Sequence, residues 1–135
     1  YYTLEQNYRN TNQIVEYVAR ELGIAMQPIG FDGPEVAHIG PRGIGAFFRE
    51  KKGLKAVIVP ESDLGRYRRK SYNVLGETGR LSKKKINLMT VYESKGLEFT
   101  CVAVADRNMT KQEKYIAYTR ALKELAVVRE GNGAQ

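Results

Sequence analysis

The sequence predicts an α/β domain in which a mainly parallel sheet is covered by helices on both faces. Two apolar runs, residues 56–59 and 99–105, read as strands buried on both sides. Helical signals lie between the strand candidates: apolar side chains recur at helical spacing after residue 10, and residues 110–113 form a Thr-x-x-Glu capping box. Strands that alternate with helices are typical of a three-layer domain.

The first 34 residues indicate a strand end, a helix and a loop. Residues 2–4 resemble the tail of a strand. Asn10 is a suitable N-cap with Gln13 three residues later, and Gly23 is a suitable helix end. Residues 24–34 contain two prolines and two glycines and are predicted to form a loop. One face of the helix carries Ile14, Val15, Val18 and Leu22.

The middle of the chain gives two strand and two helix candidates. Residues 35–39 are predicted to form a short strand that ends at Gly40 and Pro41. The spacing of Ile44, Phe47 and Phe48 predicts a helix that runs up to Gly53. The strand at 56–59 ends at Pro60, and a short helix is expected after Ser62.

The last third closes the domain. Residues 70–85 are polar and contain glycine, so they are expected to form a loop. Strands are predicted at 86–91 and 99–105. The capping box starts a helix through Ala121 or Leu122, and residues 125–128 form the last strand.

Bulk properties narrow the class of protein. The 135 residues fit one domain, spanning 1–135, and the formal net charge of +7 suits either a polyanion partner or simply a basic soluble protein. Cys101 is predicted to be a buried, inert thiol, and His38 a structural histidine. No metal site, membrane span or signal peptide is indicated, so a cytoplasmic location is expected. The start at Tyr1, in what reads as a strand end, suggests a piece of a longer protein.

The sequence contains no Gly-x4-Gly-Lys-Ser/Thr, so the chain cannot cradle a triphosphate as a P-loop domain does. Gly43 and Gly45 are interpreted as turn residues. Residues 66–70 (RYRRK) mix cations with an aromatic ring, which fits a nucleic-acid surface or a solvated helix face equally well. Residues 83–85 (KKK) are expected to lie in a loop before the strand.

Three segments carry the functional signal. They are residues 4–11 (LEQNYRNT), 89–99 (MTVYESKGLEF) and 115–121 (YIAYTRA). In this order they resemble motifs IV, V and VI of UvrD/Rep-like superfamily 1 helicases. The resemblance implies the C-terminal RecA-like (2A) domain of such a helicase, a three-layer fold of the P-loop NTPase type that lacks the P-loop itself.

The resemblance also implies an ATP site. An ATP-driven motor needs cations that reach the γ-phosphate from the domain without the P-loop, and arginine suits this task because it stays charged and binds phosphate bidentately. By resemblance, Arg120 and Arg9 are the catalytic arginines, Tyr8 stacks on adenine, and Gly96 and Glu98 belong to the ATP site. Structural alternatives stay open for each: packing for Tyr8, helix capping for Arg9, a surface position for Arg120, and a turn for Gly96 and Glu98.

Thr90, Tyr92 and Lys95 lie in the segment that the family uses to link nucleic-acid contacts to the ATP site. Tyr92 stands where most members have histidine, and Asn10 replaces a serine. Residues 10–89 lie between Arg9 of the first motif and Thr90 of the second, which suffices for the core fold, so the 2B insertion of the family is predicted to be absent or vestigial.

The sequence therefore predicts half of an ATP-dependent DNA helicase or translocase. ATP and Mg²⁺ would be held mainly by a missing N-terminal RecA-like domain, so the fragment alone is expected to be inactive. The expected partners are single-stranded DNA and that domain. Two alternatives remain open. One is a HelD-type ATPase that remodels RNA polymerase, because the tyrosine at position 92 within residues 91–99 and the TRAL run at residues 119–122 both resemble that branch. The other is a non-enzymatic nucleic-acid-binding module.

Overall fold

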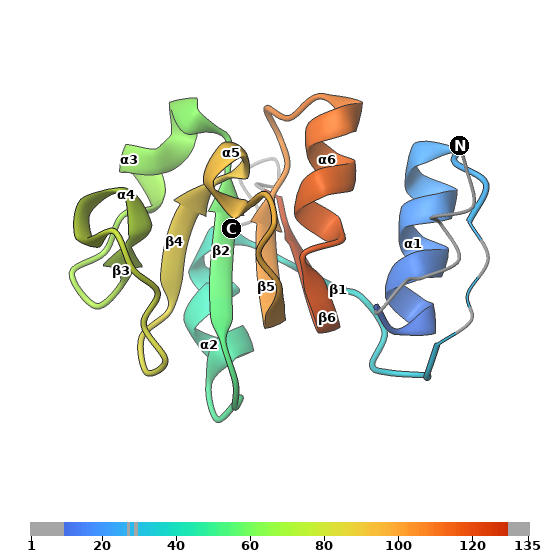
Figure 1. The fold of residues 1–135 in the computed structure, drawn as a ribbon, viewed down its shortest axis with the longest axis horizontal. Helices are drawn as coiled ribbons and strands as arrows, with labels where there is room; N and C mark the ends of the chain where they lie inside the picture. Colours follow the sequence, from blue (N-terminus) through green and yellow to red (C-terminus); the bar gives the residue numbers. More distant parts are fainter. Residues whose placement is uncertain (1–9, 27, 29, 130–135) are drawn as a thin grey trace.

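A single parallel sheet organises the molecule (Figure 1). The computed structural model describes residues 10–26, 28 and 30–129. Within these residues the sheet has six strands in the order β1-β6-β5-β2-β4-β3, and each neighbouring pair is parallel. The strands are β1 (Ala37–Ile39), β2 (Lys55–Val59), β3 (Asn73–Val74), β4 (Asn87–Thr90), β5 (Phe99–Ala105) and β6 (Ala121–Val128). The predicted α/β class is confirmed.

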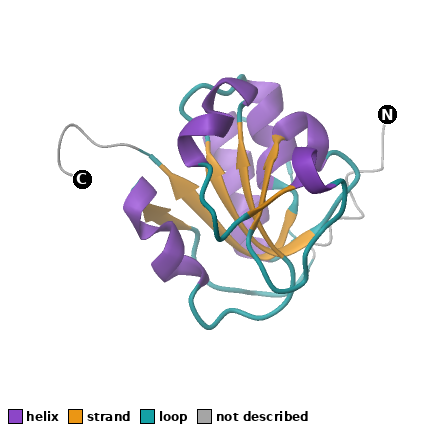
Figure 2. Cartoon of the chain, turned by 90° about the vertical axis from the view of Figure 1, so that its left-hand side faces the viewer, coloured by secondary structure: helices purple, strands orange, loops and turns teal. Residues whose placement is uncertain are grey.

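Helices cover both faces of this sheet, which makes three layers (Figures 1 and 2). One face is covered by α1, α5 and α6, and the other by α2 and α3. The helices are α1 (Asn12–Leu22), α2 (Ile44–Phe48), α3 (Leu64–Tyr67), α4 (Leu75–Thr78), α5 (Val91–Ser94) and α6 (Lys111–Tyr118), with 3-10 turns at η2 (Pro41–Gly43) and η3 (Glu61–Asp63).

The core is split into two clusters because side chains alternate across a strand. On β2, Ile58 packs towards α1 and α6, whereas Val57 and Val59 pack towards α2 and α3. All three are fully buried, as the continuous apolar run predicted. Cys101 is also buried, and this burial raises the pKa of its thiol, which fits the predicted inert cysteine.

A bulge marks the start of β5. The amides of Thr100 and Cys101 both donate to the carbonyl oxygen of Leu54, at 3.0 and 3.2 Å. Two residues therefore oppose one, which turns Phe99 and Cys101 to opposite faces of the sheet. Gly53 is required beside this bulge, because it has φ +91° and a Cβ there would collide with Thr100.

The predicted end of the last helix was wrong. The helix α6 stops at Tyr118, and Ala121 and Leu122 begin β6, which was predicted to start only at residue 125. Alanine and leucine favour helices intrinsically, but the backbone of this segment pairs with β5, and Thr11 donates its amide to Leu122. Tertiary hydrogen bonds thus override local propensity.

The region predicted as a polar loop at 70–85 contains β3 and α4. The strand predicted at 86–91 ends at Thr90, because Thr90 and Glu93 form a capping box that starts α5. The helix that begins at Ile44 ends at Phe48 rather than near Gly53.

At the other end of the chain, Thr11 and not Asn10 is the N-cap of α1, although Gly23 ends the helix as predicted, with φ +66°. Residues 2–4 lie outside the described residues. None of the helices in residues 10–26, 28 and 30–129 is long and apolar enough to cross a membrane.

Asn87 gives a test of the sheet. This fully buried side chain accepts from Asn73 and from the Ser82 amide, both at 2.8 Å, and donates to the carbonyls of Lys55 and Ser82 at 3.0 Å. Asn87→Ala leaves buried polar groups unpaired, so we expect a loss of about 2–4 kcal/mol in the free energy of unfolding, measured by urea denaturation. Asn12→Ala is the control, because its side-chain bonds are exposed. Equal losses in both variants would contradict this role.

Candidate ATP and nucleic-acid sites

Arg120 and Glu98, predicted to bind ATP, lie where strands begin, whereas Thr90 and Tyr92, predicted to bind nucleic acid, lie where a strand ends. Arg120 directly precedes β6, and Glu98 directly precedes β5. Thr90 ends β4, and Tyr92 lies on α5. Because the sheet is parallel, strand starts and strand ends occupy opposite edges. Tyr8 and Arg9 lie outside the described residues.

The three motif segments meet at the edge where β5 and β6 begin. The buried side-chain amide of Asn10 donates to the carbonyls of Thr119 and Ala121, at 2.9 and 2.5 Å. The Phe99 amide donates to the carbonyl of Arg120 at 2.9 Å. The end of the first segment is thus attached to the third, and the third to the second.

The guanidinium of Arg120 is held by groups from two of these segments. Its Nε donates to the Ile116 carbonyl at 3.0 Å, and one Nη donates to the Leu97 carbonyl at 3.2 Å. The other Nη donates to the Thr119 hydroxyl at 3.2 Å. A guanidinium has five N–H donors, so one N–H on each Nη remains for a ligand. Two such donors suit the bidentate binding of a phosphate.

Thr119 helps to orient this arginine. Its hydroxyl lies 2.8 Å from the Tyr115 carbonyl and 3.1 Å from the Ile116 carbonyl, to which it donates. The same oxygen accepts from Arg120. The hydroxyl therefore ties the guanidinium to the last turn of α6.

Gly96 and Glu98 lie on the connection between α5 and β5. Gly96 has φ +81°, the left-handed conformation that favours glycine, so its role in the turn is structural in any case. Glu98 is exposed directly before β5. The carbonyl of Leu97, between them, is the one that accepts from Arg120.

The predicted nucleic-acid residues surround α5. Thr90 accepts from the Glu93 amide at 3.2 Å and donates its own amide to the Glu93 carboxylate at 3.0 Å. Tyr92 is 79% exposed, and the Lys95 Nζ lies 4.7 Å from the centre of its ring. These two side chains line a groove of about 160 Å³ between α5 and α6, together with Val91, Gln112, Glu113 and Ile116. An exposed aromatic ring beside a cation suits a nucleic-acid base and its phosphate.

One short segment joins the two sites. Met89 is level with Ile58, and Ile58 is level with Val104, which is five residues beyond Phe99 on β5. At about 3.3 Å per residue, the edges are roughly 17 Å apart. Residues 91–98 cross this distance, so the chain that carries Tyr92 also carries the carbonyl that holds Arg120.

A buried polar cluster that the sequence analysis missed connects α1 and α6 to the ends of β5 and β6. Asp106, only 1% exposed, accepts from the Tyr118 hydroxyl and from Arg129 at 3.0 and 3.2 Å. Burial, and then the hydrogen bond to Asp106, raise the pKa of Tyr118, so its hydroxyl stays protonated and donates. Arg129 also pairs with Glu21 of α1 at 3.2 Å. Asp106 comes directly after the buried strand β5, and this position is the sequence feature that could have indicated the cluster.

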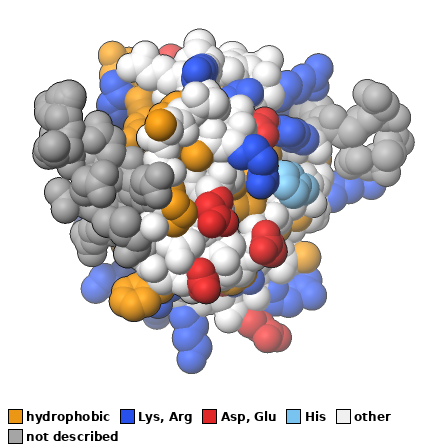
Figure 3. All heavy atoms as spheres, turned by 90° about the vertical axis from the view of Figure 1, so that its right-hand side faces the viewer, with side chains coloured by type: hydrophobic (Ala, Val, Ile, Leu, Met, Phe, Trp, Pro, Cys, Tyr) orange, Lys and Arg blue, Asp and Glu red, His pale blue; other side chains and the backbone are white. Residues whose placement is uncertain are grey.

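His38, the single histidine, is at the surface on the α1 side of the molecule, with its ring 5.7 Å from that of Tyr17 (Figure 3). The structural role predicted for it stays a prediction. Across residues 10–26, 28 and 30–129, no group of three or more His, Cys, Asp or Glu side chains could hold a metal ion.

Comparisons with known proteins identify the fold. No protein-family model matches the chain, and no curated protein matches it. A crystal structure described as the C-terminal domain of a possible DNA helicase from Lactobacillus plantarum WCFS1 is similar, with 21% sequence identity and a TM-score of 0.69. The match covers 93% of this chain and 88% of that one. The chain therefore has the fold of that helicase domain, in agreement with the predicted RecA-like architecture.

Asn10 gives a test of how the segments are joined. Asn10→Ala leaves the carbonyls of Thr119 and Ala121 without their donor in a buried setting, so we expect a loss of about 1–3 kcal/mol in the free energy of unfolding. Thermal and urea unfolding measure this loss, with Asn12→Ala as the control two residues along the chain. An unchanged stability of Asn10→Ala would show that this side chain does not hold the segments together.

Proposed function

We propose that this chain is the C-terminal motor domain of an ATP-dependent DNA helicase or translocase of the UvrD/Rep-like superfamily 1. In this proposal it supplies Arg120, together with Arg9, to ATP bound on a separate P-loop domain, and it contacts single-stranded DNA through α5. The observation that carries the proposal is the convergence of the three motif segments where β5 and β6 begin, with the Arg120 guanidinium held by groups from two of them. The similarity in fold to a helicase C-terminal domain supports it.

The chemistry assigned to Arg120 follows from its anchoring. Phosphoryl transfer is accelerated by fixed positive charge aimed at the γ-phosphate oxygens. Two backbone carbonyls and one hydroxyl already hold the guanidinium, so little reorganisation is needed when phosphate arrives. The remaining N–H on each Nη would bind two of those oxygens.

The P-loop domain would hold ATP and Mg²⁺. This sequence has no Gly-x4-Gly-Lys-Ser/Thr to wrap the phosphates. An arginine without that cradle stabilises charge but does not position the nucleotide. In this proposal the isolated chain binds ATP weakly and does not hydrolyse it.

The nucleic-acid contact is assigned to the Tyr92 ring and the Lys95 ammonium group. The ring offers a stacking surface for a base, and the ammonium group lies close enough to pair with the adjoining phosphate. Residues 91–98 then connect the DNA contact to the Leu97–Arg120 hydrogen bond. A motor needs such a connection, since DNA affinity has to change with the state of the nucleotide.

Arg120→Lys tests the catalytic assignment in a protein that carries this domain with a P-loop domain. Lysine keeps the charge but loses the forked donors, so we expect ATP turnover to fall by about 10³-fold, as for loss of an arginine finger. Steady-state phosphate release measures turnover, and circular dichroism checks the fold. Arg42→Ala, an exposed arginine on η2, should keep wild-type turnover. Undiminished turnover in Arg120→Lys would overturn the assignment.

Tyr92→Ala tests the DNA contact. Loss of one base-stacking ring is expected to cost about 1–3 kcal/mol in binding, roughly 5- to 150-fold in affinity for single-stranded DNA, whereas Tyr92→Phe should bind nearly as well as wild type. Fluorescence anisotropy with a labelled oligothymidine measures both. Equal binding by all three proteins would remove Tyr92 from the site. ATP turnover that DNA does not stimulate would instead favour the HelD-type alternative, whose partner is RNA polymerase.

A further inference from the structure

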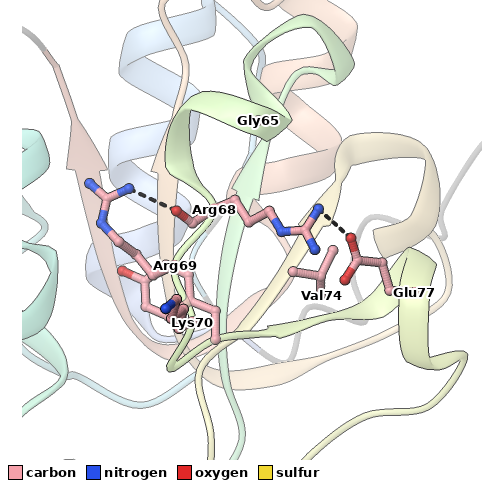
Figure 4. Close-up of a pocket in the computed structure, with 7 residues that line it drawn as sticks. Gly65, Arg68, Arg69, Lys70, Val74 and Glu77 are labelled. Atoms are coloured by element: carbon pink, nitrogen blue, oxygen red, sulfur yellow. Dashed lines mark hydrogen bonds and ion pairs between the residues drawn. The ribbon is translucent and has the colours of Figure 1, made fainter.

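A basic cavity lies beside β3, the outermost strand on one side of the sheet. After β2 the chain passes through η3 and α3, and residues 68–72 then lead to β3. This segment forms a cavity of about 370 Å³ with the start of α4 (Figure 4). Its lining includes Arg68, Arg69, Lys70, Tyr72, Val74 and Glu77. A cavity of this size exceeds a phosphate group and can also admit an attached sugar.

Three cationic residues, Arg68, Arg69 and Lys70, line this cavity together with one acidic residue, Glu77, and only Arg68 reaches that carboxylate (Figure 4). Arg68 pairs with Glu77, but both side chains are about half exposed, at 58% and 48%. Such an exposed pair contributes little stability, so a stronger anion can replace Glu77 on Arg68 at small cost. Lys70 has no ion pair among the residues that the structure describes. The cavity therefore holds more positive charge than its own carboxylate balances.

The backbone around these cations is ordered by local hydrogen bonds. One Nη of Arg69 donates to the Arg68 carbonyl at 2.9 Å (Figure 4). It also donates to the Arg66 carbonyl at 3.3 Å, so the Nε and the other Nη of this guanidinium remain for a ligand. The Tyr72 amide donates to the Arg69 carbonyl at 3.0 Å and closes a turn. Val74 is buried below, and Tyr72 is half-buried with a pKa raised by burial, so its hydroxyl stays a neutral donor.

This cavity is next to the Tyr92 site. Glu77 in the cavity and Gly76 are neighbours on α4, and a Cβ at Gly76 would lie 2.9 Å from a carboxylate oxygen of Glu93. Glu93 belongs to α5, where it directly follows Tyr92. Its carboxylate accepts from the amide of Thr90, the N-cap of that helix. The short helix α4 therefore lies between the basic cavity and α5, and Gly76 permits their close approach.

We propose that this cavity binds a backbone phosphate of the single-stranded nucleic acid whose base stacks on Tyr92. The phosphate takes the place of Glu77 on Arg68 and adds contacts to Arg69 and Lys70. The RYRRK run thus belongs to a nucleic-acid surface rather than to a solvated helix face. The inference rests on the proposed function for the identity of the ligand, but the binding step itself requires no ATP.

The test compares two triple variants of equal charge in the full chain. R68A/R69A/K70A removes three cations from the cavity, and K83A/K84A/K85A removes three exposed cations from the loop before β4. We expect the cavity variant to lose at least about tenfold in affinity for a labelled oligothymidine, and the slope of log affinity against log salt to fall by about 0.7 for each phosphate that the variant no longer neutralises. The loop variant should stay within about twofold of wild type. Equal losses in both variants would overturn the proposal.

A milder variant covers the case in which the triple variant fails to fold. Glu77→Gln removes the competing carboxylate and keeps the shape of the cavity. We expect a tighter complex with the oligothymidine, by about twofold, because Arg68 is released for the phosphate. Unchanged or weaker binding would contradict the exchange of Glu77 for phosphate.

Competition distinguishes the nucleic acid from a free anion. Inorganic phosphate, compared with chloride at equal ionic strength, should displace the oligonucleotide more readily from wild type than from the cavity variant. Phosphate binding in the cavity without any effect of R68A/R69A/K70A on the oligonucleotide would assign the site to a free anion and overturn the proposal. In that case, weakened DNA binding by Tyr92→Ala and reduced turnover by Arg120→Lys would still support the proposed function.

Discussion

Parallel pairing is the constraint on which the rest of this structure depends. In a parallel sheet every strand begins at one edge and ends at the opposite edge. Each connection must therefore run back along the full length of the strands before the next strand can begin. The starts of β5 and β6 therefore bring Leu97 and Arg120 together, although they are far apart in sequence. The ends of β2 and β4 bring α3 and α5 to the opposite edge. Two chemically different surfaces result from one topological rule.

The connection between β4 and β5, residues 91–98, is shorter than the dozen or more residues that usually join two parallel strands. Both candidate sites are in contact with this short connection. A capping box fixes its start at Thr90, a left-handed glycine turns it at Gly96, and the Leu97 carbonyl attaches its end to Arg120. In the proposed motor, a displacement of the guanidinium on phosphate binding would act on that hydrogen bond. With only residues 91–98 between the edges, little slack remains to absorb the movement before it reaches Tyr92. Coupling between the two proposed sites then needs no longer chain of contacts.

The sequence predicted the interior of the sheet well, but not its borders or the surroundings of the candidate sites. Residues 99–105 are apolar on both faces and therefore indicate a buried strand, whereas the start of β6 depends on tertiary backbone bonds and β3 has only two residues, so neither leaves a periodic pattern. The motif resemblance singled out Arg120, but not the carbonyl that holds it, because a carbonyl is present at every position. Only the fold shows that Arg68 lies against Glu77, since a cavity made by several short elements has no sequence pattern of its own.

Tyrosine in place of histidine at position 92 changes how the two sites communicate in the proposed motor. An imidazole has two ring nitrogens and can bridge a ligand on one side and a protein group on the other, whereas a phenol has one polar atom at the tip of a larger ring. Tyr92 directs that ring into solvent beside Lys95, which suits stacking but not a side-chain relay towards Arg120. In the proposed motor, the backbone at Gly96 and Leu97 is then the connection between Tyr92 and Arg120. In that proposed motor the link depends on a backbone turn that favours glycine at position 96.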